Sequence, residues 1–296
     1  MSTAALSAPH SGGRTRARGV RGRMPGWAWC TVCSLISAMF LLPLAGLVVT
    51  VFKSPQEAAA SPPSYLPHHV SGDNFAKLSG SGTGLWRYLL NTAGVSLGTV
   101  LLTVTVSTLA GYGFARFRFP LRGPLFGVVL LGMMVPFQAI LTPLYMVLRT
   151  LHLQNSLTGL VLVYATFQMP ISVFLMRNSF EQVPAALLES AQSDGCSALS
   201  ALWRVLLPVV APGAVSVALF AFFSAWNEFL AALVLLSDDA KFTLPVFLSS
   251  LVSGRLGSVD WGVLEAGVLV AMVPCVVIFL LLQRYYVKGL VAGSVK

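Results

Sequence analysis

Six long runs of the sequence contain almost no charged residue, and this feature constrains the fold more than any other. A helix of roughly 20 apolar residues spans the hydrocarbon core of a bilayer, which is about 30 Å thick. Apolar side chains surround each run on all sides, which is typical of helices in lipid or among neighbouring helices. The six expected spans are Trp27–Phe52, the run between Arg87 and Arg116, the run between Arg122 and Arg149, the run between Arg149 and Arg177, Pro212–Leu236, and Val263–Leu282.

The composition excludes a water-soluble protein. Only 10% of the residues are charged and 56% are hydrophobic, whereas a soluble domain carries about 25% charged residues. The same figures exclude intrinsic disorder, which needs low hydrophobicity and high charge. Membrane helices tolerate the prolines that lie within or at the ends of the spans, namely Pro43, Pro136, Pro143, Pro170 and Pro274. We therefore expect an all-α polytopic membrane protein with six transmembrane helices.

The basic residues predict the orientation in the membrane. The 19 Lys and Arg outnumber the 10 Asp and Glu, for a net charge of +9, and short cytoplasmic loops carry an excess of Lys and Arg. If both termini are cytoplasmic, 13 of the 19 lie inside, and those outside are Lys53, Lys77, Arg87, Arg149, Lys241 and Arg255. We therefore expect a multi-pass cell-membrane protein with both termini in the cytoplasm.

Residues 1–26 form a basic tail that contains the run GGRTRARGVRGR. Such a run is compatible with nucleic acid or anionic lipid, but no aromatic or folded element accompanies it. We interpret the tail as a disordered, positive-inside anchor and expect no nucleic-acid partner. Ala58-Ala59-Ala60 is similar to a signal-peptide cleavage site, yet the preceding apolar run exceeds the usual h-region of about 7–15 residues. A retained first helix is therefore expected.

The cysteines and histidines predict neither a disulfide framework nor a metal site. Cys30-x-x-Cys33 has the spacing of a metal or redox motif, but it opens a membrane helix with no His or acid nearby. The other cysteines are Cys196 and Cys275, and the four histidines lie in the tail and the loops. We expect no metal and no cofactor in this chain.

The segment between the fourth and fifth spans, residues 181–212, is too long and too apolar for a simple connector. Pro184 suits the first turn of a helix, and residues 185–192 are strong helix formers. One stripe of this helix is expected to hold Leu187, Leu188 and Ala191, facing away from Glu189 and Gln192. Gly195 is expected to take a left-handed backbone conformation, and a second short helix, 197–206, is expected to end at Pro208.

This bent pair of helices has two interpretations. It is either an interfacial amphipathic element or a docking element for a soluble partner, since a compact apolar knob suits a groove. Helix propensity and spacing leave both open.

Several motifs together resemble permease subunits of binding-protein-dependent ABC importers. Glu189-Ser190-Ala191, Asp194-Gly195 and Leu206-Leu207-Pro208 resemble the EAA loop of that family, from whose usual alanines Ser190 and Cys196 depart. The other motifs are LNTAGVSLGTVLLTVTVSTLAGYGFARFRF at 90–119, Pro136-Phe137-Gln138, Pro143-Leu144-Tyr145, Trp226-Asn227-Glu228-Phe229, Asp260-Trp261-Gly262 and the tail QRYYVKG at 283–289. This tail is typical of the carbohydrate-uptake branch, in its maltose-transport-like second permease. The resemblance covers about 86–296.

The resemblance implies a sugar importer of the bacterial plasma membrane, built from two different permeases, two cytoplasmic ATPase subunits and an external solute-binding protein. The chain has no G-x-x-x-x-G-K-[ST] loop, so ATP and Mg would be bound by the ATPase, and this chain would not be an enzyme. The implied coupling residues are Glu189, Ser190, Ala191, Asp194, Gly195, Leu207 and Pro208. The expected segments are the tail 1–26, the first helix 27–52, an extracytoplasmic loop 53–85 and a permease module 86–296 with its coupling loop at about 181–212.

An acid interrupts the fifth expected span. A charge within a span is costly, so Glu228 should face the bundle interior or a water-filled path. Two interpretations stay open: Glu228 lines the sugar path together with Asn227, or it forms a structural hydrogen bond between helices. Trp226 would offer an aromatic face to a sugar. Further path candidates are Gln138 and, more weakly, Asn91 and Gln168.

Three other classes of membrane protein are alternatives to this interpretation. A secondary transporter commonly carries several ion-coupling acids at the midplane, and an intramembrane hydrolase needs a nucleophile paired with a base within the spans. The closest alternative is an ABC importer permease for a non-sugar solute such as a polyamine, glycerol phosphate or an amino acid, because such permeases share the EAA loop.

Overall fold

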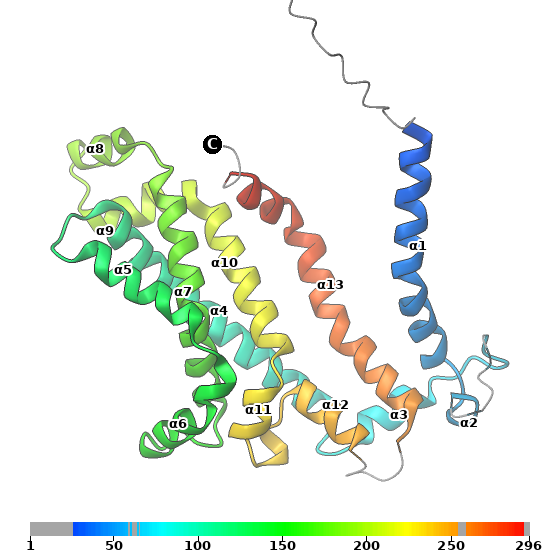
Figure 1. The fold of residues 1–296 in the computed structure, drawn as a ribbon. Helices are drawn as coiled ribbons and strands as arrows, with labels where there is room; N and C mark the ends of the chain where they lie inside the picture. The colour runs from blue at the N-terminus through cyan, green and yellow to red at the C-terminus, as the bar shows by residue number, and fades with distance from the viewer. Residues whose placement is uncertain (1–25, 59, 61–63, 65, 254–258, 293–296) are drawn as a thin grey trace, which may run out of the picture. The chain divides into compact units, whose positions relative to one another are not determined.

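The computed structural model describes residues 26–58, 60, 64, 66–253 and 259–292, and for residues 26 and 284–292 it describes the backbone alone. Every regular element in these ranges is a helix (Figure 1). The all-α class is therefore confirmed. Most of the basic tail lies outside the described residues, as do Ala59, Arg255 and Lys296.

The contacts divide the chain into two units, residues 1–45 and 46–296, and each is described by itself. The first unit contains most of α1 (Gly26–Val51), which is apolar and long enough to cross a membrane.

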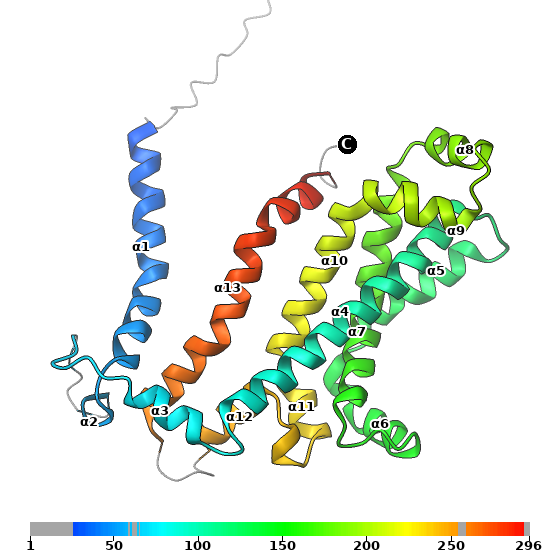
Figure 2. The same ribbon diagram turned by 180° about the vertical axis from the view of Figure 1, so that it is seen from behind.

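Three long helices form the centre of the second unit: α4, α7 and α10 pack against one another, and α13 packs on α10 (Figures 1 and 2). Helices α8 and α9 lie at one end of this group, which we name the α8 end, while α3, α6, α11 and α12 lie at the opposite end. The helices of this unit are α2 (Pro55–Ala58), α3 (Asp73–Gly80), α4 (Leu85–Arg116), α5 (Arg122–Leu131), α6 (Phe137–Thr150), α7 (Leu157–Glu181), α8 (Ala185–Ser193), α9 (Ala198–Ala201), α10 (Leu207–Asn227), α11 (Leu230–Leu235), α12 (Leu244–Val252) and α13 (Trp261–Ala292).

Small residues let α4 and α7 approach closely. A Cβ placed on Gly111 would lie only 2.6 Å from the Cβ of Met176 and 2.8 Å from the backbone nitrogen of Arg177. One face of α4 also buries a row of hydroxyl side chains, namely Thr92, Ser96, Thr99, Thr103 and Ser107. Interfaces between membrane helices are rich in such small residues, because helices in lipid associate mainly by close packing.

Among the described residues, five helices are long and apolar enough to cross a membrane, and a sixth span exists if a bent pair is counted as one. The bent pair replaces the straight third span that the sequence predicts. The segment Arg122–Met134 and α6 meet at an angle of 104°. The break lies at Val135 and Pro136, where the backbone is extended. Proline has no N–H to donate and keeps the preceding residue out of the helical region, so the helix ends there.

The fifth span was predicted at 212–236, and this placement is wrong. The helix runs from Ala198 to Asn227 through α9, a π-helical turn at Leu202–Leu206 and α10. The predicted break at Pro208 is also wrong, because the helix continues through that residue. A π-helical turn rearranges the local i→i−4 hydrogen bonds, and here it comes directly before the proline that cannot donate one.

The remaining spans agree with the prediction apart from their ends. Helix α7 begins at Leu157 because the Ser156 side chain accepts a hydrogen bond from the backbone N–H of Gly159. Helix α13 begins at Trp261, where the Asp260 carboxylate accepts from the backbone N–H of Val263, and it extends ten residues beyond the predicted end at Leu282.

Candidate functional site

Helix α8 is a short separate helix, and together with α9 it lies at one end of the bundle (Figures 1 and 2). The predicted helix and the predicted left-handed glycine are both confirmed, since Gly195 has φ +83°. The turn after α8 is closed by hydrogen bonds from Cys196 N–H to the Ala191 carbonyl and from Gly195 N–H to the Gln192 carbonyl. This pattern is the common glycine-dependent end of a helix, and it fixes the angle at which the chain turns back.

The faces of α8 differ in exposure. Ala191 is buried, Leu188 is half-buried, and Glu189, Ser190 and Asp194 are exposed. The predicted apolar stripe is therefore wrong at one position, because Leu187 is 39% exposed. Only Leu188 and Ala191 of this nine-residue helix pack against the bundle, so the Leu187 side chain is accessible to a partner.

An arginine and a tyrosine from α4 hold the α8 segment in place. The Arg116 Nη2 donates to the carbonyls of Phe180 and Val183, at 2.6 and 2.5 Å, and the Tyr112 hydroxyl donates to the Ala198 carbonyl at 3.1 Å. Hydrogen bonds from a charged donor contribute about 1.5–3 kcal/mol. Both ends of the α8 segment are therefore attached to α4.

The sequence analysis did not single out Arg116 or Tyr112 as site residues. The sequence contains one signal for Arg116: it is the residue at which a charge-free span ends. A long basic side chain at the end of a helix donates to carbonyl groups that have no other partner. Beneath the segment, Phe180, Leu202 and Leu206 are fully buried in one apolar cluster. Leu206 thus anchors the element from below, while Leu207 is half-buried and Pro208 is exposed at the start of α10.

Glu228 lies at a break between two helices, not inside a span. Helix α10 ends at Asn227, and the Glu228 carboxylate accepts hydrogen bonds from the backbone N–H groups of Ala231 (2.9 Å) and Ala232 (3.2 Å). The Tyr164 hydroxyl of α7 donates to the same carboxylate at 2.6 Å. Glu228 therefore caps the short helix α11 and joins it to α7.

The other path candidates lie in different surroundings. Trp226 is 5% exposed, stacks on Phe222, and donates from its indole N–H to the Ala271 carbonyl of α13. Asn227 is exposed and donates to the Phe223 carbonyl of its own helix. The structure thus places Trp226 in the contact between α10 and α13 and leaves the Asn227 side chain accessible.

The three amides outside this run lie on three different helices. Gln138 is exposed at the start of α6, and Gln168 is half-buried on α7. The Asn91 side chain donates to the carbonyls of Ala240 and Phe242, so it holds the segment before α12 against α4.

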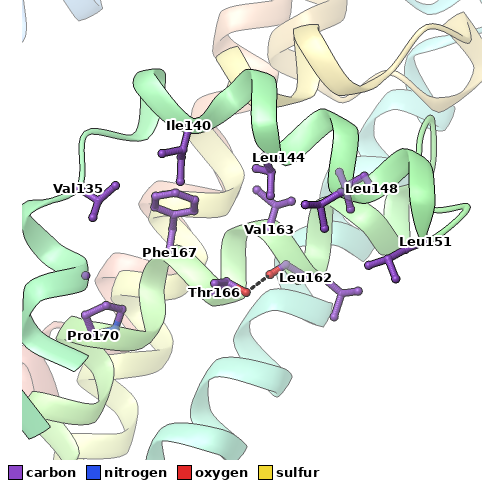
Figure 3. Close-up of a pocket in the computed structure, with 12 residues that line it drawn as sticks. Val135, Ile140, Leu144, Leu148, Leu151, Leu162, Val163, Thr166, Phe167 and Pro170 are labelled. Carbon is purple, nitrogen blue, oxygen red and sulfur yellow. Dashed lines mark hydrogen bonds between the residues drawn. The ribbon is translucent and has the colours of Figure 1, made fainter. Parts of the chain in front are cut away.

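An apolar pocket of about 370 Å³ lies between the bent α5–α6 pair and α7. Figure 3 shows Val135 and Ile140 on one side of it, opposite Phe167 and Pro170 of α7. The Thr166 hydroxyl in the lining already donates to the Leu162 carbonyl of its own helix. The lining therefore offers hydrocarbon contact and little hydrogen bonding, and Gln138 is not part of it.

Glu265 is a second acid within an expected span, and the sequence analysis overlooked it although it follows the start of the sixth span by two residues. Its side chain lies close to Thr50 and to Lys53, which is 5% exposed. The Asn74 amide donates to the carbonyls of Val51 and Lys53. This polar cluster joins residues 50–53 to α3 and α13, and an acid shortly downstream of a span start is the signal that would have found it.

No group of three or more His, Cys, Asp or Glu side chains able to hold a metal ion occurs in the described ranges. All four cysteines are free thiols: Cys30 and Cys33 at the start of α1 are exposed, and Cys196 and Cys275 are half-buried.

Comparison with known proteins gives a consistent family. The sequence profile described as "Binding-protein-dependent transport system inner membrane component" matches residues 103–291. The chain is similar to the sulfoquinovosyl glycerol transport system permease protein SmoH of Agrobacterium fabrum, with 32% identity over 89% of this chain and 91% of the relative. It is also similar to the arabinooligosaccharides transport system permease protein AraQ of Bacillus subtilis, with 32% identity over 88% of this chain and 92% of the relative.

A solved structure shares the fold. It is a chain of a bacterial ABC transporter involved in the import of the acidic polysaccharide alginate, with a TM-score of 0.77 and 20% identity over 88% of this chain and 96% of that chain. The match confirms the arrangement of helices that the described residues show.

Proposed function

The chain belongs to the family of inner membrane components of binding-protein-dependent transport systems, and from this premise we propose that it is one of two non-identical permease subunits of an ATP-driven sugar importer. The relatives support a sugar or sugar derivative, since one is named for sulfoquinovosyl glycerol and another for arabinooligosaccharides. These names favour sugar over polyamine, glycerol phosphate or amino acid. The second permease, two cytoplasmic ATPase subunits and an external solute-binding protein complete the proposed assembly.

The observation that carries this proposal is the position and support of α8. The helix and the residue after it present Glu189, Ser190 and Asp194 to the exterior, while Arg116 and Tyr112 attach the residues that flank the helix on both sides to α4. A short helix held this way transmits a displacement to the bundle without bending. We infer that α8 and the turn at Gly195 dock in a cleft of the ATPase, which binds ATP and Mg, and that closure of the ATPase pair moves the permease between two states.

The translocation path is proposed to pass the break after α10. Asn227 is the exposed polar side chain there, and Gln138 is an exposed amide at the other helix break. The contacts of Glu228 support the structural interpretation of that residue, because all three of its hydrogen bonds are made to α7 and α11. Glu228 would then hold the break open for its neighbour Asn227 and would reach the substrate only indirectly. Trp226 would act through the packing of α10 on α13.

The test of the proposed function is ATP-dependent uptake by the whole assembly. We expect the tagged chain, isolated from its native membrane, to bring along an ABC ATPase and a second permease. In proteoliposomes with the binding protein outside and ATP inside, the complex should accumulate a radiolabelled oligosaccharide but not putrescine, glycerol 3-phosphate or an amino acid. Accumulation of one of these three in place of the sugar would support the non-sugar alternative, and absence of any ATPase from the complex would contradict the proposal.

The proposed orientation places the α8 end in the cytoplasm, because cytoplasmic segments carry an excess of Lys and Arg. The segments at the α8 end contain five arginines, namely Arg116, Arg118, Arg122, Arg177 and Arg204. With the four native cysteines replaced by alanine, we expect His69→Cys to react with a membrane-impermeant maleimide in intact cells. Ser193→Cys should react only after permeabilisation. Both positions are exposed, so equal labelling from one side would contradict the orientation.

A further inference from the structure

A polar groove of about 530 Å³ lies at the α8 end, and we name it the basic groove. One wall is formed by Arg116 at the end of α4, Arg118 in the connection to α5, and Arg122 at the start of α5. The facing wall is formed by Leu188, Glu189 and Gln192 of α8. The lining thus contains three guanidinium groups and one carboxylate, so an anion is the ligand that its charge favours.

The three arginines differ in the hydrogen bonds and ion pairs that they make within the described residues. Arg122 lies 3.5 Å from the Glu181 carboxylate. Arg116 gives its Nη2 to two carbonyls, but its Nε is a buried donor without a hydrogen-bond partner within the described part of the chain. Arg118 is exposed and makes no hydrogen bond or ion pair to any residue that the structure describes. The donors of Arg118 are therefore available to a ligand, whereas the buried Nε of Arg116 lacks an acceptor, which is costly.

Exposed apolar side chains lie beside this charge. Phe117, Leu121 and Leu125 are 46%, 68% and 47% exposed, and they alternate with Arg118 and Arg122 along the connection between α4 and α5. These residues stand where two apolar helices end, which is the level of the lipid headgroups. Apolar side chains that enter the acyl region next to arginines that meet phosphate are the pattern of an anionic-lipid site.

We propose that the basic groove binds the headgroup of an anionic phospholipid, phosphatidylglycerol. Its phosphodiester meets the Arg118 guanidinium, on the wall that also carries the positive charge of Arg116, because arginine donors match the oxygens of a phosphate. Its acyl chains lie over Phe117 and Leu121. The lipid would then join α8 to the end of α4 from the membrane side. This site is independent of the transported solute, and lipid binding is measured without transport.

The test is lipid binding by the full-length chain, followed by native mass spectrometry during titration with phosphatidylglycerol. Arg118→Gln removes a charge that makes no contact within the described residues, so the fold is expected to stay intact. We expect this variant to bind phosphatidylglycerol about fivefold more weakly, the contribution of one basic residue at an anionic surface. Arg204→Gln is the matched control, because Arg204 is exposed near the same end but does not line the groove. It should bind as the wild type does.

Five outcomes would overturn the proposal. Equal binding by Arg118→Gln and wild type, or an equal loss in Arg204→Gln, would leave only a general effect of positive charge. Binding of phosphatidylethanolamine as tight as that of phosphatidylglycerol would remove the preference for an anion. Displacement of the lipid by an equal concentration of inorganic phosphate would identify free phosphate as the ligand, and release of the lipid when the ATPase binds would identify the groove as part of the docking surface for that subunit.

Discussion

Gly195→Asp is expected to reduce sugar uptake to near background while the protein remains inserted in the membrane. Gly195 has φ +83°, a backbone conformation that costs other residues roughly 1–2 kcal/mol. A Cβ at this position would meet nothing within 4 Å in the described residues. A large loss of function can therefore not come from a clash within the chain. It would come from the altered turn, or from a side chain and a charge placed against the ATPase. Uptake of labelled sugar and co-purification of the ATPase measure the effect.

Two further variants separate these causes. Gly195→Asn has nearly the size of aspartate, tolerates the left-handed region and carries no charge, so uptake retained by Asn but lost with Asp assigns the effect to charge. Gly123→Asp is the matched control, since Gly123 is exposed at the same end, has ordinary φ and has nothing within 4 Å of a Cβ.

The outcomes for the Gly195 variants also locate the defect. Normal uptake by Gly195→Asp in an intact complex would contradict the docking role of the turn and favour the inert interfacial helix. Lost uptake with the ATPase still bound would place the defect in transmission after docking. Glu189→Lys, which inverts an exposed charge on α8, should fail in the same way as Gly195→Asp.

Glu228→Ala is expected to lower the free energy of unfolding by about 3 kcal/mol and to abolish uptake. The change removes the cap of α11 and leaves the Tyr164 hydroxyl, on a buried side chain, without its acceptor. The break after α10 would then lose the contacts that hold it to α7. Thermal unfolding in detergent measures the first effect, and uptake kinetics at varied sugar concentration measure the second.

Tyr164→Phe and Asn227→Ala distinguish the two interpretations of Glu228. Tyr164→Phe removes one of the three hydrogen bonds and touches no proposed path residue, so it should give a smaller loss of stability and a parallel loss of uptake. Asn227→Ala should keep the stability and raise KM for the sugar. If Glu228→Ala leaves stability unchanged and raises KM alone, Glu228 lines the path and the structural interpretation is wrong.

The sequence by itself determined the features that depend on local composition and short-range preference. Charge-free runs of about 20 residues predict helices in a membrane whatever their neighbours are, and α1, α4, α7 and α13 lie where those runs lie. The same holds for α8 and its turn, because helix propensity and the freedom of Gly195 act within a few residues. The family motifs then predict that this turn docks on a partner.

Only the tertiary structure decided where the helices break and what their polar residues contact. Pro136 interrupts its helix but Pro208 does not, since a π-helical turn precedes Pro208. Glu228 accepts a hydrogen bond from Tyr164, which lies 64 residues away in the sequence. Arg116 donates to the Phe180 carbonyl at the same sequence separation. The hydrophobic periodicity of the sequence cannot predict such pairs. Their geometry depends on how α4, α7 and α10 pack, and that packing is a property of the assembled bundle.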